Sequence, residues 1–316
     1  MLVGYTYDPI YARHDMGEGH PECPERVLAI DAHLRSVGLF QQLACFDAKP
    51  ASREDVLRAH EQNYVDRVFA LAPRAGQTQQ LDADTAMNES TLPAALTAAG
   101  AAIAAVDHVL DGSFIRAFCN VRPPGHHAES NRAMGFCIFN SIAIAARYAC
   151  SVRGLQRVAI VDWDVHHGNG TEEILAGDAH VLMVHSFQSP LYPYSGIEAL
   201  GDNTCNIPLA PYSDGATLRQ RWIKEALPAL EAFDPELILI SAGFDAHRDD
   251  PLAQLNWTEQ DFAWATEQLH QLSLRSAAQG RIVSLLEGGY NLKALALSVE
   301  AHIRGLIADH HYFNCW

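Results

Sequence analysis

The 316-residue chain has few basic side chains for its length. It carries 22 lysines and arginines against 38 acidic residues, which gives a formal net charge of −16. Without a basic stripe to neutralise phosphates, nucleic acid is not an expected partner. The field of such a chain favours cationic partners, such as lysine-bearing tails or polyamines. Taken alone, however, the charge fits equally well with the general acidity of many soluble proteins.

The chain also lacks features of secreted and membrane proteins. Its seven cysteines are odd in number and include no C-x-x-C pair, so neither a disulfide framework nor a thiolate zinc site is expected. The N-terminal residues lack the basic start and apolar stretch of a signal peptide. No uninterrupted apolar run reaches the ~20 residues that span a membrane. We therefore expect a soluble, cytoplasmic protein without membrane contact.

No low-complexity linker, repeat or charge block divides the chain, so one catalytic domain over residues 1–316 is expected. Short apolar runs alternate with helical patterns, which predicts an α/β fold with a central, mostly parallel sheet and helices on both faces. Strands are predicted near residues 2–7, 114–121, 157–162, 180–185, 236–241 and 281–286. Helices are predicted near residues 24–37, 53–70, 88–110, 138–152, 214–232, 258–278 and 291–308.

Polar residues of catalytic type gather directly after four of the predicted strands. These segments are residues 122–127, 162–170, 241–247 and 287–291. The carboxyl ends of strands in an open parallel sheet form its ligand-binding edge. The four segments are therefore predicted to meet at one site.

The second of these segments has the spacing of a metal site. Asp162, Asp164 and His166 alternate, so their side chains project to one side of an extended segment. Asp245 adds a carboxylate from another strand end. Three protein ligands with an open position define a catalytic zinc site, and Asp164, His166 and Asp245 are the predicted ligands. The alternative is that the two aspartates of the segment cap the turn or helix that follows.

Two further features fit acid–base and oxyanion chemistry. His126 and His127 follow a stiff Pro-Pro-Gly turn, and such a pair suits proton transfer from metal-activated water. Tyr290 follows two glycines at a strand end, where its hydroxyl could donate to an oxyanion. A surface histidine pair and a packed aromatic side chain are the alternatives.

Taken together, the motifs closely resemble the histone deacetylase and acetylpolyamine amidohydrolase superfamily, most of all its bacterial and class II branch. They are Gly-His-Pro-Glu-Cys-Pro-Glu-Arg (19–26), Arg-Pro-Pro-Gly-His-His (122–127), Asp-Trp-Asp-Val-His-His-Gly-Asn-Gly (162–170), Ser-Ala-Gly-Phe-Asp-Ala (241–246) and Glu-Gly-Gly-Tyr (287–290). The resemblance covers nearly the whole chain. It implies an arginase-like α/β fold and a zinc-dependent amidohydrolase that removes acetyl or longer acyl groups from amines.

The resemblance also assigns roles around the same three zinc ligands. It implies that His127 is the general base, with His126 as its electrostatic partner oriented by Asp162. Tyr290 would polarise the amide carbonyl together with zinc. Asn169 takes the position next to the base that is an aspartate in some branches, and its amide brings no charge to raise the pKa of His127.

For the substrate, the resemblance implies a narrow acyl-lysine tunnel. Gly135 would supply a backbone carbonyl for the substrate N–H, and Phe136 one wall. Tyr192 looks like the opposite wall. Leu252 and Gly289 are further expected substrate-binding positions.

Two expectations concern the surroundings of the site. Arg26 matches an arginine that the family associates with product exit. A potassium ion beside Asp162 remains possible, although residues 183–187, Met-Val-His-Ser-Phe, do not clearly reproduce the Ser-x-His of the family's potassium site. Iron or cobalt could also replace zinc in an Asp/His/Asp site.

Alternative functions stay open at this point. A polyamine deacetylase needs an acidic rim; a polyamine-selective relative has glutamate at the position of Leu252, but Glu18, Asp82 or Asp84 could supply the charge. An arginase-like binuclear manganese enzyme would need more metal-binding carboxylates than this sequence offers, and it would have no role for Tyr290. A silent acyl-amine binding protein is disfavoured because the base and the oxyanion donor are both present. A homo-oligomer is possible.

Overall fold

The structure is a computed structural model that describes residues 2–308, and its centre is an eight-stranded sheet. The strands of this sheet are β1 (Val3–Thr6), β2 (Leu43–Cys45), β5 (Arg116–Cys119), β6 (Val158–Asp162), β7 (Val181–Gln188), β8 (Thr204–Leu209), β9 (Leu237–Ala242) and β10 (Ile282–Leu286). Their order is β2-β1-β5-β10-β9-β6-β7-β8, and each pair is parallel. This arrangement confirms the predicted α/β fold.

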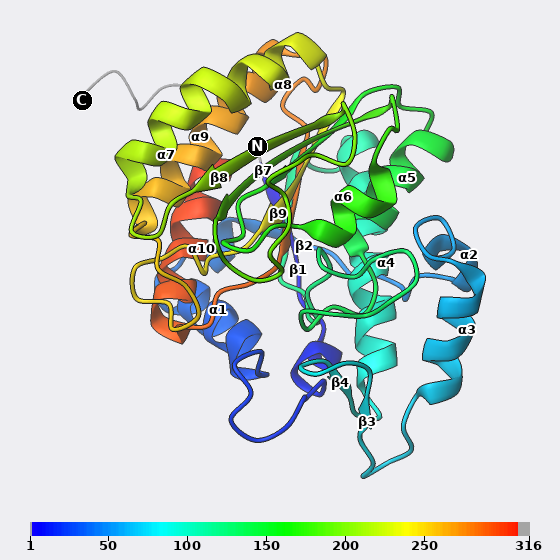
Figure 1. Ribbon diagram of the computed structural model, residues 1–316. Helices are drawn as coiled ribbons and strands as arrows, with labels where there is room; N and C mark the ends of the chain where they lie inside the picture. The colour runs from blue at the N-terminus through cyan, green and yellow to red at the C-terminus, as the bar shows by residue number, and fades with distance from the viewer. Residues whose placement is uncertain (1, 309–316) are drawn as a thin grey trace.

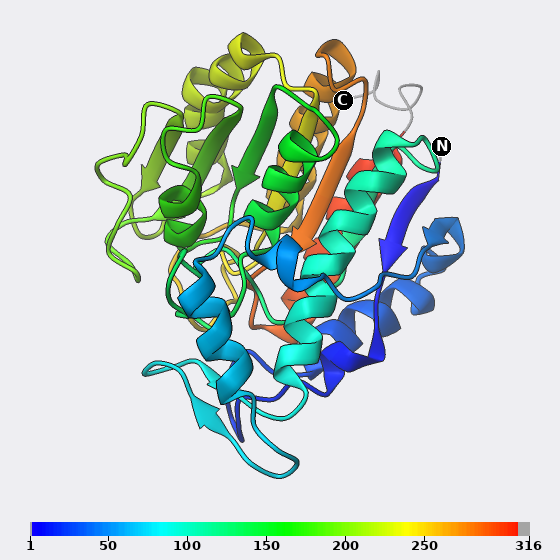
Figure 2. The same ribbon diagram turned by 90° about the vertical axis from the view of Figure 1, so that its right-hand side faces the viewer.

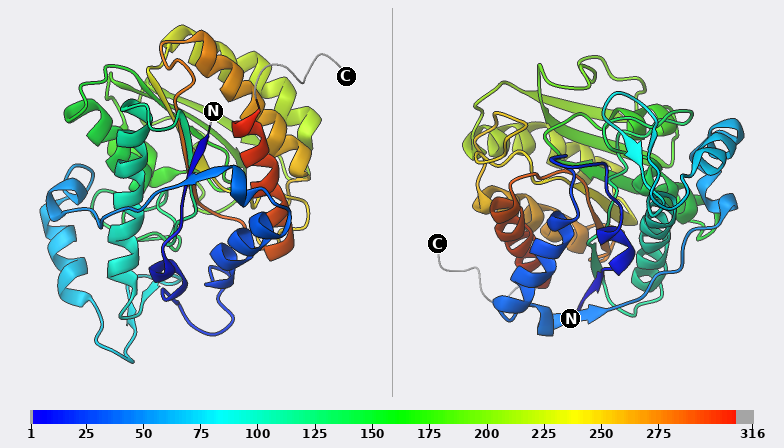
Figure 3. Two further views of the ribbon diagram at one scale, coloured as in Figure 1. Left: turned by 180° about the vertical axis from the view of Figure 1, so that it is seen from behind. Right: turned by 90° about the horizontal axis from the view of Figure 1, so that it is seen from below.

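Helices cover both faces of the sheet (Figures 1 and 2). The helices are α1 (Glu25–Ser36), α2 (Arg53–Val56), α3 (Gln62–Leu71), α4 (Thr91–Leu110), α5 (Ser141–Ser151), α6 (Asn169–Leu175), α7 (Gly215–Arg221), α8 (Leu227–Phe233), α9 (Glu259–Arg275) and α10 (Leu292–Ile307). Helices α4 and α5 pack together on one face, whereas α1, α10 and α9 pack on the other (Figure 3). A small hairpin, β3 (Gln79–Gln80) with β4 (Ala86–Met87), lies apart from the sheet.

The central strands bring distant segments of the chain together. β5, β10, β9 and β6 are consecutive neighbours in the sheet. Their residues are buried throughout, as expected for parallel strands covered on both faces. Because all four run the same way, the segments that follow them end at one edge, where the four polar clusters were predicted to meet.

The predicted elements differ from the observed ones in a few places. All six predicted strands are present, but β2, β3, β4, β8 and α6 were not predicted. The helix predicted over residues 53–70 is two helices, α2 and α3. A capping box at Ser52 begins α2, and α3 begins only at Gln62 after a turn.

Helix α4 is 20 residues long and apolar enough to cross a membrane by length and composition alone. However, 61% of its most apolar window is buried inside the protein. It packs against α5, β5 and β10. The helix is therefore accounted for as a core helix, and polar residues interrupt its apolar sequence.

Candidate active site

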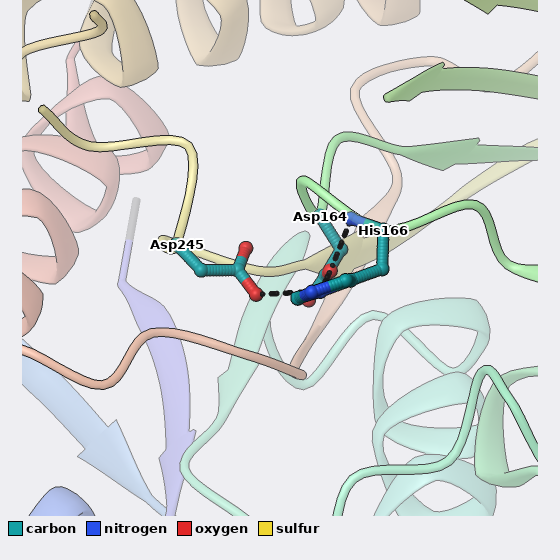
Figure 4. A group of neighbouring side chains, drawn as sticks. All are labelled: Asp164, His166 and Asp245. Atoms are coloured by element: carbon teal, nitrogen blue, oxygen red, sulfur yellow. Dashed lines mark hydrogen bonds and ion pairs between the residues drawn. The ribbon is translucent and has the colours of Figure 1, made fainter. Parts of the chain in front are cut away.

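The three predicted metal ligands lie together in the structure. Asp164 and His166 follow β6 and Asp245 follows β9, and their donor atoms all lie within 4.8 Å of one another (Figure 4). Backbone N–H groups hold the carboxylates: Gly288 donates to Asp164 Oδ2 at 2.8 Å and Val165 donates to Asp245 Oδ1 at 2.9 Å. Asp245 Oδ2 is buried, accepts no hydrogen bond of good geometry from the described residues and lies 3.2 Å from His166 Nδ1 (Figure 4). Two buried carboxylates and an imidazole this close together fit a divalent cation such as zinc.

Glycines make this close arrangement possible. A Cβ atom at Gly288 would lie 2.1 Å from Asp245 Oδ2, and one at Gly243 would lie 2.1 Å from Asp164 Oδ2. Such contacts are too short for any side chain. The glycines of the two motifs therefore let the backbone pass directly behind the ligands.

His126 is held by carboxylates on two sides. Its Nδ1 lies 2.9 Å from Asp162 Oδ2, and its Nε2 lies 3.8 Å from Asp164 Oδ1. Burial lowers the pKa of His126, but the two aspartates outweigh burial and raise it well above its ordinary value. Glu287 fixes the turn, because its Oε2 accepts the N–H groups of Gly125 at 2.7 Å and of His126 at 3.2 Å.

The tautomer of His127 follows from a chain of hydrogen bonds. Asn169 Nδ2 donates to Glu129 Oε1 at 2.8 Å, and a carboxylate only accepts. The amide oxygen of Asn169 therefore faces His127 Nδ1 at 2.7 Å, so Nδ1 carries the proton. Burial, together with His126 and His166, holds the pKa of His127 well below its ordinary value. The other nitrogen, Nε2, is thus left unprotonated and free to accept a proton.

A cavity of about 270 Å³ opens beside these groups. It is lined by Asp84, His127, Gly135, Phe136, His166, Leu191, Tyr192, Tyr194, Leu252 and Tyr290. The Phe136 and Tyr290 rings meet edge to face at 5.9 Å, and the His127 and Tyr192 rings do so at 5.3 Å. Gly135 must be a glycine here, because its Cβ would lie 2.5 Å from the His127 ring. The cavity is therefore an aromatic-walled space that reaches one of the predicted metal ligands, His166.

Tyr290 rests on a buried arginine. The guanidinium carbon of Arg26 lies 4.9 Å from the centre of the Tyr290 ring. Arg26 donates to the carbonyl of Gly289 at 2.7 Å and to Glu22 at 2.9 Å. The Tyr290 N–H donates to Asp250 at 2.7 Å. Among the residues expected to bind substrate, Gly289 is thus a support for the tyrosine turn and does not line the cavity.

One part of the site was not predicted from the sequence. Glu22 is buried and binds both Arg26 and Arg122, and His14 Nε2 lies 3.3 Å from its Oε2. Arg122 also donates to the backbone carbonyls of Tyr11 at 2.6 Å and His14 at 2.9 Å. Both Glu22 and Arg122 lie in quoted motifs, but their spacing of 100 residues gave no sign of pairing.

Comparisons with known proteins agree with this geometry. The histone deacetylase domain profile matches residues 20–306. The chain is 39% identical over 97% of its length to an uncharacterized protein of Synechocystis sp., all of which is covered. It is 39% identical over 86% of its length to the histone deacetylase-like amidohydrolase of Pseudomonas aeruginosa, covering 73% of that protein. The chain belongs to the histone deacetylase family.

This histone deacetylase family member is also similar to a second curated relative and to a solved structure. It is 38% identical over 91% of its length to polyamine deacetylase HDAC10 of Mus musculus, of which 45% is covered. The crystal structure of the HDA15 HD domain superposes with a TM-score of 0.91 at 32% identity, covering 97% of this chain and 89% of that one. The fold is thus that of a hydrolytic deacetylase domain.

Some of the remaining predicted site residues of this deacetylase domain line the cavity and others do not. Leu252 and Asp84 both line the cavity. Glu18 and Asp82, the other candidates for an acidic rim, are not among its lining residues. The role of Arg26 in product exit stays a prediction.

The surroundings of Asp162 differ from those expected for potassium. Potassium is bound by oxygen atoms, such as backbone carbonyls. In the sheet register, however, Asp162 pairs with His185 of β7, whose Nδ1 lies 3.7 Å from Asp162 Oδ2. At this position beside Asp162 the chain therefore has an imidazole and no side-chain oxygen.

Proposed function

We propose that the chain is a zinc-dependent deacylase that removes acetyl or longer acyl groups from lysine side chains. The observation that carries the proposal is the position of His127 in the cavity wall. Its ring lies 5.8 Å from the His166 ring, and its Nδ1 is tied to Asn169. A general base for an amide hydrolysis needs this combination of a fixed tautomer, a free nitrogen and a neighbouring metal site.

Each residue has a definite task in this reaction. A zinc ion held by Asp164, His166 and Asp245 would supply Lewis-acid activation of a carbonyl and of water. His127 Nε2 takes the proton of the attacking water and later gives it to the leaving amine. The Tyr290 hydroxyl donates to the carbonyl oxygen as negative charge develops there, a contribution typically worth about 10²–10³ in rate.

The aromatic walls explain the preference for a slender acyl-amine. Phe136 and Tyr192 both line the cavity and contact the rings of Tyr290 and His127, respectively. An extended acyl-lysine chain suits such walls, and Leu252 adds apolar surface to the lining. These contacts support lysine side chains over a ligand with a second charge.

The test is turnover of an acetyl-lysine peptide by the zinc-loaded protein and by its His127→Ala variant. We expect the variant to lose turnover while it still binds one equivalent of zinc. His180→Ala is the matched control, because the His180 side chain is 50% exposed and contacts Asp178. Retained turnover in His127→Ala would contradict the assignment of the base.

A polyamine deacetylase is the second candidate, and Asp84 is the observation that favours it. Its carboxylate belongs to a residue that lines the cavity, where it could hold a distant ammonium group. Paired assays on acetyl-lysine peptides and acetylated polyamines separate the two functions. Activity on polyamines alone, lost in Asp84→Asn, would move the assignment to this candidate.

A further inference from the structure

His185 is a buried histidine that the proposed reaction does not use. It lies on β7 with 1% of its surface exposed. Neither ring nitrogen has a hydrogen-bond partner among residues 2–308. A buried polar group without a partner loses its hydrogen bonds to water and gains none in return. The imidazole therefore destabilises the fold unless it interacts with a charge nearby.

Asp162 is the charged residue that faces His185. His185 Nδ1 lies 3.7 Å from Asp162 Oδ2, the same oxygen that receives His126 Nδ1 at 2.9 Å. This distance is too long for a hydrogen bond but short enough for an ion pair.

The other charged and titratable groups around His185 are already engaged. The His167 ring lies 5.1 Å from the His185 ring, but its Nδ1 lies 2.8 Å from Ser195 Oγ. Glu172 of α6 lies 3.2 Å from His167 Nε2 and also accepts a hydrogen bond from Asn206. Asp162 is the acid whose carboxylate lies within ion-pair distance of His185.

The backbone closes the space between these two side chains. A Cβ atom at Gly168 would lie 2.3 Å from Asp162 Oδ2 and 3.1 Å from His185 Nδ1. The glycine thus passes directly over the pair. The imidazole of His185 therefore occupies a tightly packed position beside Asp162.

We propose that His185 replaces a monovalent cation beside Asp162, and that this deacetylase therefore works without potassium. Its imidazole is the electrostatic partner that holds the Asp162 carboxylate in place for His126. His185 is a positioning residue, since it reaches the reaction only through Asp162 and His126. The inference rests on the proposed function for its catalytic consequence, but cation binding is measured independently of turnover.

The first experiment detects the cation directly. Crystals of the wild-type protein and of His185→Ser are grown in rubidium chloride, and anomalous scattering locates the ion. We expect no rubidium peak beside Asp162 in the wild type and a peak there in His185→Ser, because the hydroxyl supplies an oxygen and the lost ring leaves space. In solution, potassium should raise the Tm of His185→Ser above its value in tetramethylammonium chloride and leave that of the wild type unchanged. A rubidium peak beside Asp162 in the wild type would overturn the proposal even if the variant fails to fold.

The second experiment reads the positioning role. In tetramethylammonium chloride we expect kcat of His185→Ser to fall about 10–100-fold, as for other residues that orient a catalytic group, with KM little changed. Potassium chloride at about 0.15 M should restore most of that loss. The wild type and the matched control His180→Ser should have the same kcat in both salts.

The outcomes separate the inference from the proposed function. A wild-type enzyme that needs potassium for turnover would refute the inference and leave the deacylase function standing. A wild type without turnover on acylated amines would refute the function, whereas the rubidium and Tm results would still decide the role of His185. A folded His185→Ser that neither binds rubidium nor responds to potassium would also overturn the inference.

Discussion

At the scale of single residues, the amide of Asn169 matters because of the carboxylate behind it. Branches of the family that have aspartate at this position place a charge next to the base. Here Glu129 Oε1 accepts from Asn169 Nδ2 at 2.8 Å. Arg132 donates to both oxygens of the same carboxylate, to Oε2 at 2.7 Å and to Oε1 at 2.8 Å. The donor of the amide is therefore as important to the site as its acceptor.

This leads to a prediction about Asn169→Asp. The substitution sets a second carboxylate against Glu129, and the repulsion should move the partner of His127. We expect kcat/KM to fall by about 10–100-fold, the usual effect of losing a group that orients a catalytic histidine. The double variant Asn169→Asp with Glu129→Gln should recover much of this loss, because the glutamine amide can donate to the new carboxylate. A fully active Asn169→Asp single variant would show that Glu129 does not control the amide.

Glu287 provides a pH-dependent prediction. Burial raises its pKa to about 7, against the opposing effects of His126 and the Gly125 N–H. A raised acid pKa means that the folded state favours the protonated form. Its stabilising contribution is therefore present below the ordinary pKa near 4.5 and is lost as the pH rises through 7.

Glu287→Gln keeps this side chain neutral at every pH. We expect the free energy of unfolding of the variant, relative to the wild type, to increase from pH 5 to pH 8. Urea denaturation of both proteins at the two pH values measures this difference, and titrating groups that do not interact with Glu287 cancel in the comparison. A difference that does not change with pH would mean that Glu287 is ionised in the fold throughout this range.

At the scale of helices and strands, the long buried elements were predictable and the edges were not. The runs at β6 and β9 are apolar throughout, which is typical of central parallel strands. β8 lies at the edge of the sheet and is half-exposed along much of its length. It contains Pro208, and proline in a strand is tolerated at a sheet edge but argues against a central strand. β2 at the other edge has only three residues. Such edge strands form because they pair with the neighbouring strand in the sheet. That pairing cannot be read from the local sequence.

The site shows the same limit. Asp164, His166 and Asp245 could be predicted because alternation and strand ends place them on one side. The link from Glu22 to Arg122, by contrast, depends on how β5 lies relative to the loop before α1, which no local pattern records. His185 was noticed only as a departure from a motif, and its contact with Asp162 comes from the register of β6 and β7.

Helix α4 carries a prediction in which two effects oppose each other. Replacing Gly100 by Ala favours the helix by about 1 kcal/mol. However, the new Cβ would lie 1.9 Å from the carbonyl oxygen of Lys49 and 2.8 Å from the N atom of Ala51. Backbone atoms cannot move aside cheaply, and overpacking typically costs about 1–3 kcal/mol. We therefore expect Gly100→Ala to lower the Tm without changing zinc content.

The control is Gly305→Ala in α10. Its Cβ would meet a side-chain carbon of Thr266 at 2.9 Å rather than backbone, so the loss should be smaller. Thermal unfolding of both variants by circular dichroism makes the comparison. A higher Tm for Gly100→Ala would show that the segment around Lys49 yields more easily than its contacts suggest.

At the scale of the whole molecule, the net charge of −16 acts on the approach of substrate rather than on the reaction. Salt screens this field, since the Debye length falls from about 30 Å at 0.01 M to about 8 Å at 0.15 M. For an acetyl-lysine peptide with flanking lysines, we expect KM to rise over this range while kcat stays constant. The reaction itself takes place among buried groups, which salt screens much less.

A neutral acetyl-lysine substrate without flanking charges is the control for this prediction, because it presents the same acyl group to the same cavity. Its KM should not change with salt. If both substrates respond equally, salt acts on the site itself and the acidic surface has no part in substrate capture. If the KM of the basic peptide alone responds to salt, the acidic surface selects cationic substrates before the aromatic walls select the acyl-lysine chain. Surface substitutions and cavity substitutions can then alter these two steps separately.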